Sequence, residues 1–350
     1  MGKVCSFRKG YGIAKDDLSS DGTPCILYGE LYTTYKTAIA KTIKSKTSIQ
    51  SKSLVYSQKD DVIIPCSGET AEDIATSICV PYDGVLLGGD LTIVHSDLDG
   101  AFLSNQINSV RKYDIARIAQ GKSIVHLQAD ELKKIFIFYP SIQEQRKISA
   151  FIDKIDERIE IQNKIISKYE TLIKGLCDMI FRHNKSVSLS DLVKCKTSAL
   201  QENTVSTCHR GEYKVLGASG AIAAIDTYQF EESGILVLKD GSKAGKIQFA
   251  QGKYSVVGTS VVLIPNEACD ARYLYFAMSS IDFEKYKVGS GIPHIYFKDY
   301  SNERIYYPDK ALRKKITKTL DFYESMVEIE RKMLSAMQKQ KAFLLQSMFI

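Results

Sequence analysis

One stretch, residues 140–181, constrains the fold more than any other part of the sequence. Alternating steps of four and three residues from Ile148 give ten positions, nine of them apolar. These positions are Ile148, Ile152, Ile155, Ile159, Gln162, Ile166, Tyr169, Ile173, Leu176 and Ile180. Charged side chains fill most of the gaps, which is the pattern of a coiled-coil seam. The stretch therefore predicts one long helix that packs along a partner helix.

The start of this helix carries a capping signal. Ser141 at the N-cap position and Glu144 three residues later form a capping box, and Pro140 lies just outside it. Gly175 is the weak position in the run. A helix over 144–181 would be about 57 Å long at a rise of about 1.5 Å per residue.

The same stretch occurs twice. Residues 140–181 align with 308–349 at an offset of 168, and the alignment extends upstream, where 121–126 falls on 289–294 without a gap. Both upstream segments have the pattern Gly-x-Ser/Gly-Ile-x-His. Internal repetition of this kind decides architecture before any local motif does. We expect two copies of one plan, each a globular block followed by a long helix.

Short apolar runs separated by glycines predict strand-rich blocks. In the first block we expect strands over 60–70, 84–96 and 101–107, a helix over 108–119, and a turn followed by a strand over 121–140. The second block repeats this order, with a helix near 270–284. The blocks resemble each other most in their last thirty or so residues and differ earlier. A shared frame with different surfaces suits two modules that read different things.

Length and charge set limits on the class of protein. The 350 residues leave room for two cores of about 130 residues each. The net charge is +6, yet residues 1–140 carry 16 basic and 16 acidic side chains and residues 186–308 carry 13 of each. The excess therefore lies on the helical segments 141–185 and 309–350. Overall charge is weak evidence for nucleic-acid binding, and local patches must supply the evidence.

The sequence favours a cytoplasmic protein. It has no run of eighteen apolar residues, and the N-terminal segment MGKVCSFRKG lacks the apolar core of a signal peptide. That segment matches the loose myristoylation pattern Met-Gly-x-x-x-Ser, which we set aside. Eight cysteines without a Cys-x-x-Cys pair are typical of reduced thiols, and the single pair Cys208-His209 is a poor zinc site. We expect no bound metal.

Motifs that would carry catalysis are missing from the sequence. Residues 241–246, GSKAGK, resemble a phosphate-binding loop, but the spacing is one residue short and Ile247 stands where Ser or Thr is required. The chain contains no Asn/Asp-Pro-Pro-Tyr/Phe, His-Glu-x-x-His or Gly-x-Ser-x-Gly. Asp60 and Asp61 could belong to a nuclease only by adjacency, and a turn explains them better. We expect a non-catalytic chain.

Two histidines, His126 and His294, occupy the same position in the repeated turn. In one interpretation the imidazole and the loop amides approach a phosphate. In the other, each histidine fixes the turn before the last strand of its block. Retention in both copies, where other surfaces differ, favours the structural interpretation. Gly121, Gly289 and Gly291 suit a positive φ or a close backbone approach.

With these residues in view, the chain resembles the specificity (S) subunit of type I restriction-modification systems. The resemblance rests on the repeat and on YPSIQEQRKISAFIDKIDERI (139–159), echoed by YYPDKALRKKITKTLDFYESM (306–326). TPCILYGELYTTY (23–35) and VLKDGSKAGKI (237–247) also resemble parts of the family's target recognition domains. The second copy departs from the pattern, because Ala311-Leu312-Arg313 replace Gln143-Glu144-Gln145 and Asp309 becomes the expected cap.

The resemblance implies an α+β protein with an internal pseudo-two-fold repeat. Target recognition domains would span 1–139 and 186–307, and the long helices over 140–185 and 308–350 would form an antiparallel coiled coil. Each domain would read one half of a bipartite double-stranded DNA target, and the helices would set the spacing and dock the modification subunits. The implied partners are DNA, the modification (methyltransferase) subunits and the restriction (ATP-dependent translocase/nuclease) subunit. The chain itself would hold no cofactor, with S-adenosylmethionine and ATP on those partners.

Candidate DNA contacts are loop residues with basic, hydroxyl or aromatic side chains, which suit phosphate contact and base-edge probing. Thr33 to Ser57 is rich in lysine and lacks acids, so it is either a DNA-contacting segment or a solvated surface. In the first domain we predict contacts from Lys9, Tyr11, Lys15, Tyr35, Lys36, Ser67, Lys122 and Ser123. In the second we predict contacts from Ser219, Lys239, Ser242, Lys243, Thr259, Ser260 and Ser290.

Two other classes of function compete with this one. A coiled-coil scaffold without DNA recognition would explain the helices but not the paired, divergent blocks. An enzyme that acts alone would need the missing motifs. The target sequence and the spacer length cannot be predicted from residue types, because base readout depends on docking geometry.

Overall fold

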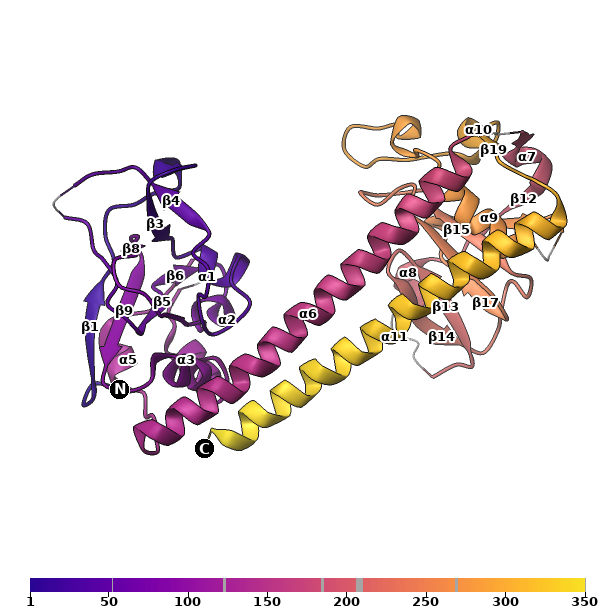
Figure 1. Ribbon diagram of the computed structural model, residues 1–350. Coiled ribbons are helices and arrows are strands. Elements are labelled where there is room, and N and C mark those ends of the chain that lie inside the picture. The colour runs from indigo at the N-terminus through magenta and orange to yellow at the C-terminus, as the bar shows by residue number, and fades with distance from the viewer. Residues whose placement is uncertain (52, 122–123, 184–185, 206–209, 268–269, 350) are drawn as a thin grey trace. The chain divides into compact units, whose positions relative to one another are not determined.

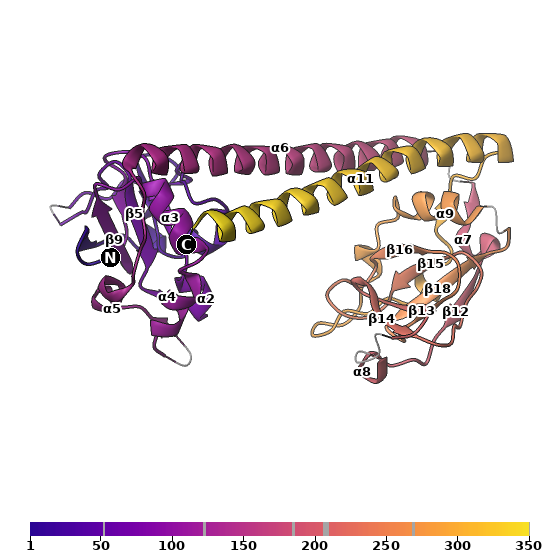
Figure 2. The same ribbon diagram turned by 90° about the horizontal axis from the view of Figure 1, so that it is seen from below.

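Two long helices organise the computed structural model, which describes residues 1–51, 53–121, 124–183, 186–205, 210–267 and 270–349 (Figure 1). They are α6 (Ile142–Phe181) and α11 (Lys310–Met348). Both run without interruption, α6 passing through Gly175 (Figure 2). The chain divides into two compact units, Met1–Asn163 with Lys332–Ile350, and Lys164–Arg331. Each unit therefore contains part of both long helices.

The predicted seam is the packed face of α6. All ten seam positions are buried or half-buried, whereas Ile161 and Met179, which lie off the seam, are exposed. In the first unit Lys341 Nζ lies 2.5 Å from Asp156 Oδ1, and in the second Arg331 lies 2.5 Å from Glu170. Numbers rise along α6 as they fall along α11, so the helices are antiparallel, which confirms the predicted coiled coil.

Among its described residues, the first unit holds three small sheets and five short helices. Its main sheet is antiparallel, in the order β1 (Cys5–Lys9), β9 (Leu91–Ser96), β5 (Asp61–Pro65) and β7 (Ile78–Val80). A second sheet has the order β2 (Leu18–Ser19), β4 (Ser45–Thr47), β3 (Thr23–Ile26) and β8 (Leu86–Leu87), and β10 (Val125–His126) pairs with β6 (Ser67–Gly68). The short helices are α1 (Glu30–Thr33), α2 (Ala71–Ile74), α3 (Gly100–Asn108), α4 (Lys112–Ile118) and α5 (Ala129–Lys134).

The second unit repeats this organisation. Its main antiparallel sheet has the order β12 (Val193–Thr197), β18 (Ser260–Pro265), β15 (Gly234–Leu238) and β16 (Ile247–Ala250). A second sheet has the order β14 (Gly220–Ile225), β13 (Tyr213–Gly217) and β17 (Tyr254–Val256), and β11 (Val187–Ser188) pairs with β19 (Arg304–Ile305). The short helices are α7 (Leu189–Leu192), α8 (Glu202–Val205), α9 (Ala271–Met278) and α10 (Phe297–Tyr300).

The two main sheets have one strand order. Numbered along the chain, each runs first, fourth, second, third. One helix follows the fourth strand in both units, α3 after β9 and α9 after β18. In the second unit α9 packs between the sheet and the long helices, because its buried side chains share a core with β15 and with Leu320 of α11. The internal repeat that the sequence predicts is therefore a repeat of topology.

A polar side chain joins the first turn of each long helix to its globular block. In α6 the amide of Gln145 donates from Nε2 to the carbonyl of Pro140 at 2.8 Å and accepts from the backbone N–H of Asp99 at 3.0 Å. Asp99 is the N-cap of α3. In α11 the guanidinium of Arg313 donates to the carbonyl of Pro308 at 2.7 Å and to both carboxylate oxygens of Asp270, the N-cap residue of α9.

The second copy therefore departs from the pattern without losing the connection. At the position of Gln145 in the first copy, the second copy has the cation Arg313. The hydrogen-bond partner correspondingly changes from the backbone N–H of Asp99 to the buried carboxylate of Asp270. Asp309 caps α11 as predicted, since its Oδ1 accepts from the N–H of Leu312 at 3.0 Å. The start of the second long helix is thus fixed by Asp309 and Arg313.

The C-terminal end of each long helix packs against an aromatic residue of a short helix. Phe181, near the end of α6, packs against Tyr273 of α9 with ring centroids 5.6 Å apart. Phe349 follows α11 and packs against Phe102 of α3 at 5.0 Å. Both phenylalanines are almost fully buried. Phe181 and Phe349, which align in the repeat, therefore each pack the end of a long helix against a short helix, one in each unit.

Two local predictions were wrong. Residues 101–107, expected as a strand, belong to α3, which begins after the N-cap Asp99. The carboxylate of Asp99 accepts from the N–H of Phe102 at 2.8 Å, which favours a helix start. The segment 121–140 was expected to be a turn followed by a strand. It contains the two-residue strand β10 and then a short helix, α5, and residues 135–140 form no strand.

Two global properties complete the fold. Across the described ranges, no helix combines the length and the apolar character that crossing a bilayer requires. The six described cysteines are free thiols, and Cys25, Cys79 and Cys177 are buried.

The connection at Arg313 generates a stability prediction. The side chains of Arg313 and Asp270 are only 9% and 6% exposed, so removing one leaves a buried charge without its main partner. Arg313→Ala should lower the free energy of unfolding by about 3 kcal/mol in denaturant titrations. Arg331→Ala, which removes a solvent-exposed ion pair with Glu170, should cost less than about 1 kcal/mol. Equal losses in the two variants would contradict this role of Arg313.

Candidate nucleic-acid interface

The predicted contacts of the second domain lie on loops that the backbone holds together. The loop between β15 and β16 meets the repeated turn, because the N–H of Gly241 donates to the carbonyl of Pro293 at 2.9 Å. The N–H of Lys239 donates to the carbonyl of Thr259 at 2.8 Å, at the start of β18. Segments far apart in sequence, near residues 240, 259 and 293, thus form one edge of the unit.

Exposure divides the predicted residues of this edge. The side chains of Ser242, Lys243 and Ser290 are exposed, and those of Lys239 and Thr259 are half-buried. Ser260 is buried in β18, so its hydroxyl is not available at the surface. Ser219 is exposed in the turn between β13 and β14.

The turn that carries Ser219 touches the same loop region. Gln248 donates from Nε2 to the carbonyl of Gly217 at 2.9 Å, and Lys246 Nζ donates to the carbonyl of Ala218 at 3.3 Å. The loop 239–246 therefore has neighbours on both sides. It carries three lysines against the single acid Asp240, a composition that suits a polyanion.

The repeated turn has a structural role in both units. His294 and Val288 exchange backbone hydrogen bonds of 2.8 and 2.9 Å, and His126 and Gln120 exchange bonds of 2.7 and 2.9 Å. Gly289 has φ of 96°, a conformation that favours glycine. These backbone hydrogen bonds close the turn in each unit without involving the imidazoles.

The imidazole of His294 makes a further contact, to the basic loop. Its Nδ1 lies 2.8 Å from Asp240 Oδ1, so the imidazole donates to a carboxylate on the basic loop. The side chain of His126 is exposed. His294 thus fixes Asp240 and the loop that carries Lys239 and Lys243.

In the first unit the predicted residues are distributed over separate segments. Lys9 ends β1, and the N–H of Tyr11 donates to the carbonyl of Leu87 at 3.1 Å, leaving the Tyr11 side chain 57% exposed. Lys15 is exposed in a short 3-10 turn, Lys15–Asp17. A side chain at Gly10 would have its Cβ 2.0 Å from the carbonyl oxygen of Gly88. The close contact between these two backbone segments therefore requires glycine at position 10.

The remaining residues of the first unit differ in accessibility. Lys36 is exposed, while Tyr35 is half-buried and its hydroxyl accepts from the N–H of Lys44 at 3.4 Å. Burial raises the pKa of Tyr35 to about 12, so the phenol stays neutral. Ser67 is buried and donates to Asp90 Oδ2 at 3.1 Å. Lys122 and Ser123 lie outside the described residues.

Some exposed basic and aromatic groups were missed by sequence reasoning. Lys253 lies 4.8 Å from the ring centroid of Tyr228 and 5.9 Å from that of Tyr213, and Lys298 lies 5.6 Å from that of Tyr296. Cation–π pairs are common in proteins, and exposed basic and aromatic groups can contact phosphates and bases. Lys253 and Tyr228 are 25 residues apart in sequence, so no local pattern points to the pair.

The described residues thus form an internally repeated protein, whose two main sheets have one strand order and whose loops differ. The model of the family described as "Type I restriction modification DNA specificity domain" matches residues 1–171 and 182–338. The chain belongs to this family of specificity subunits.

Individual relatives support the same assignment. The type I restriction enzyme MjaVIII specificity subunit of Methanocaldococcus jannaschii is 28% identical over 122 residues, which cover 34% of this chain and 28% of that protein. The S subunit of a type I restriction-modification system from M. genitalium has a similar crystal structure, with a TM-score of 0.66 and 16% identity, covering 100% of this chain and 94% of that one.

A second solved structure comes from work on complex assembly and conformational transition of the type I R-M system. Its TM-score is 0.58 at 15% identity, and the match covers 99% of this chain and 95% of that one. At such identities both structures show a common fold. The matched segment of the curated relative spans less than a third of that protein's length.

The basic loop generates a prediction about DNA binding. Lys243→Ala should weaken binding of duplex DNA to a similar degree for all sequences and reduce the slope of log Kd against log salt by about 1, because each lost phosphate contact releases about one counterion fewer. Fluorescence anisotropy at several salt concentrations measures both quantities. Lys194, exposed at the opposite end of the same sheet, is the matched control. An equal change in Lys194→Ala would contradict the assignment of the loop 239–246 to the DNA interface.

Proposed function

We propose that this chain is the DNA-recognition subunit of a type I restriction-modification complex and binds a bipartite double-stranded DNA target. The observation that carries the proposal is the repeated main sheet, which keeps one strand order in both units while the loops differ. A constant frame with divergent loops suits two modules that read two half-sites. Residues 1–139 and 186–307 are the proposed target recognition domains.

In this proposal the long helices, within residues 140–185 and 308–350, set the distance between the half-sites. The 40 residues of α6 make a rod of about 60 Å. This length exceeds one turn of duplex DNA, about 34 Å, so modules carried by such a rod can address separated half-sites. The bases between the half-sites would be crossed without being read.

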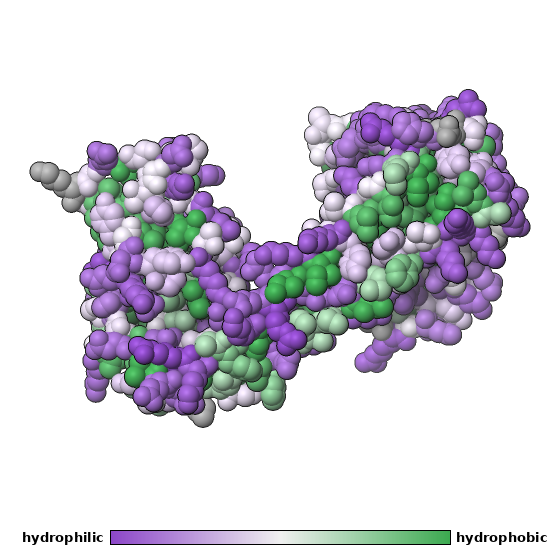
Figure 3. All heavy atoms as spheres, in the orientation of Figure 1, coloured by the Kyte–Doolittle hydropathy of each residue, from purple (hydrophilic) through white to green (hydrophobic). Residues whose placement is uncertain are grey.

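The proposed docking surface for the modification subunits is the apolar part of the helices outside the seam. Figure 3 shows apolar surface along both long helices. In the second unit Leu172 and Met179 of α6 and Phe322 and Ile329 of α11 are exposed. Exposed apolar side chains in such numbers on one pair of helices are typical of a protein-protein contact surface.

The proposal assigns the chemistry to partner subunits. Methyl transfer from S-adenosylmethionine would belong to the modification subunits, and ATP-driven translocation and cleavage to a restriction subunit. The absence of methyltransferase and hydrolase motifs from the sequence supports this division. A coiled-coil scaffold without DNA recognition is the competing function, and the exposed lysines of the loop 239–246 favour DNA recognition over it.

A domain exchange tests the bipartite arrangement. Replacing residues 1–139 by the first recognition domain of another specificity subunit should change one half-site and leave the other half-site and the spacer unchanged. Methylation mapping of DNA from cells that express the exchanged subunit with its modification subunits gives the result directly. A change in both half-sites would contradict independent reading of the half-sites. If the complex that contains the wild-type chain showed no sequence preference at all, the scaffold function would be favoured.

A substitution on the helix tests the docking surface. Phe322→Glu places a charge in the proposed apolar contact and should weaken binding of the modification subunits by about 30-fold or more, a loss of about 2 kcal/mol. Ser335, exposed about 140° around α11 from Phe322, is the control position for Ser335→Glu. Isothermal titration measures both affinities. Similar affinities in the two variants would place the docking surface elsewhere.

A further inference from the structure

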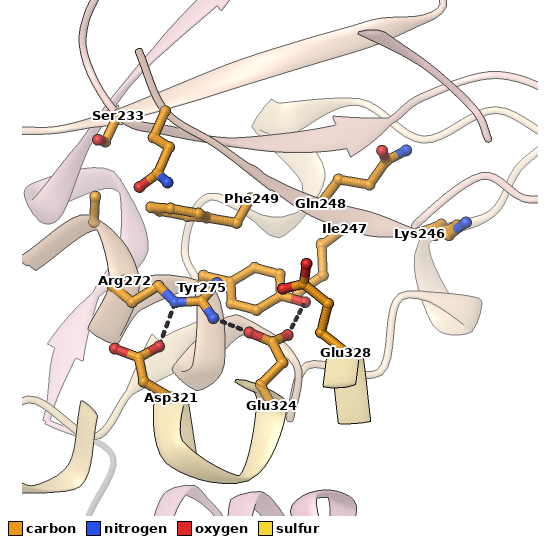
Figure 4. A pocket seen from close by; sticks show the side chains of 12 residues that line it. Ser233, Lys246, Ile247, Gln248, Phe249, Arg272, Tyr275, Asp321, Glu324 and Glu328 are labelled. Carbon is orange, nitrogen blue, oxygen red and sulfur yellow. Dashed lines mark hydrogen bonds and ion pairs between the residues drawn. The ribbon is translucent and has the colours of Figure 1, made fainter. Parts of the chain in front are cut away.

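A partly buried arginine connects the second globular block to α11 (Figure 4). Arg272 of α9 donates from Nε to Asp321 Oδ1 at 2.5 Å and forms an ion pair with Glu324. The hydroxyl of Tyr275 donates to Glu324 at 3.3 Å. These side chains line a cavity of about 740 Å³ between the block and the helix. The carboxylates therefore accept from two residues of α9.

Three aromatic rings surround the Arg272 guanidinium. The carbon Cζ lies 4.7 Å from the ring centroid of Phe249, 5.0 Å from that of Tyr275 and 4.8 Å from that of Phe276. The side chain is only 25% exposed. A planar guanidinium held by rings and carboxylates has few alternative rotamers, so it fixes the orientation of α9 relative to α11.

A lysine makes the corresponding connection in the first unit. Lys41 Nζ lies 2.6 Å from Asp153 Oδ1 and 2.9 Å from Glu157 Oε1, both on α6. The hydroxyl of Tyr82 donates to the backbone carbonyl of Lys41 at 2.6 Å, which holds the loop. Hydrogen bonds from Lys154 and from Lys41 lower the pKa of Glu157 to about 2, so this carboxylate stays ionised at neutral pH.

The repeat offset relates one carboxylate of each group. Asp153 aligns with Asp321, whereas Glu157, the other partner of Lys41, aligns with Ser325. Glu324 aligns with Asp156, which pairs with Lys341 of α11. The cations, in contrast, come from unrelated places: Lys41 lies in a loop before β4, and Arg272 lies in α9. One carboxylate position, Asp153 in α6 and Asp321 in α11, is thus common to both copies, while each globular block reaches it with its own side chain.

Each block is held to its long helix at two points along the helix. The first point is Gln145 in α6 and Arg313 in α11, and the second begins eight residues later, at Asp153 and Asp321. Eight residues correspond to about 12 Å along the axis. One polar attachment beside an apolar contact leaves a pivot, whereas two attachments this far apart fix the direction of the block relative to the helix.

We propose that Arg272 and Lys41 are positioning residues that fix the angle of each recognition domain on its helix and thereby restrict the spacing between the two half-sites. This inference rests on the proposed bipartite recognition of DNA. The two residues act through the helix carboxylates and not through contact with bases. Arg272 has the larger effect, because Lys41 is 43% exposed and its ion pairs are weakened by solvent.

The test uses the full chain assembled with its modification subunits. Duplexes that carry both half-sites with the native spacer, or with one base pair added or removed, serve as methylation substrates. In the wild type the native spacer is preferred. In Arg272→Ala the preference for the native spacer should fall about tenfold, while the half-site sequences stay the same, and Arg272→Lys should give an intermediate preference because charge remains without the planar fork.

Control variants separate positioning from general stability. Arg331→Ala removes an exposed ion pair with Glu170 in the same unit and should leave the spacer preference unchanged. In the first unit, Lys41→Ala should relax the preference a few fold, with Lys134→Ala, which removes a separate ion pair with Glu131, as its control. If Arg272→Ala does not fold, Glu324→Gln removes one partner of the arginine and retains Asp321 and the aromatic rings.

The outcomes distinguish this inference from the proposed function. An unchanged spacer preference in folded Arg272→Ala or Glu324→Gln overturns the positioning role while bipartite recognition stands. Absence of any half-site or spacer preference in the wild-type complex overturns the proposed function itself. A relaxed preference in Arg331→Ala equal to that in Arg272→Ala would also overturn the inference, since any weakened ion pair would then suffice.

Discussion

The attachment of each long helix through its first turn is the interaction on which the rest of the structure depends. In α6 a neutral amide, Gln145, meets the N-cap residue Asp99, and Ser149 donates to the carboxylate of Asp99 at 2.6 Å. In α11 Arg313 meets the carboxylate of Asp270 with two donors. The same N-cap position thus serves both the short helix and the long one. Sheet, short helix and rod are fixed together by one buried polar group in each unit.

Much of this architecture follows from the sequence, because the seam and the repeat are periodic signals over many residues. The helix α3 shows where such signals end. Residues 102–107 are all buried, so α3 has no polar face and its sequence, AFLSNQI, lacks a helical period. The usable signal was local, because Asp99, two residues before this run, is a favoured N-cap residue. Length and apolar character alone could not separate this buried helix from a strand.

The candidate site was predictable in kind but not in arrangement. Ser242 and Lys243 of the loop 239–246 are exposed, yet the neighbours of this loop at residues 259 and 293 are set by backbone hydrogen bonds across tens of residues. Residue type also says little about depth, since the hydroxyls of Ser67 and Ser260 are buried while that of Ser242 is exposed. Pairs such as Lys253 with Tyr228 form only when the strands have paired.

The packing of Phe349 on Phe102 has a consequence for how the protein is made. The second unit is one continuous segment, Lys164–Arg331, whereas the first unit joins Met1–Asn163 to residues that follow 331. On the ribosome the second unit is available in full while the first still lacks the residue that covers Phe102. The block synthesised first therefore completes its packing last, and it exposes the apolar surface around Phe102 until α11 has emerged.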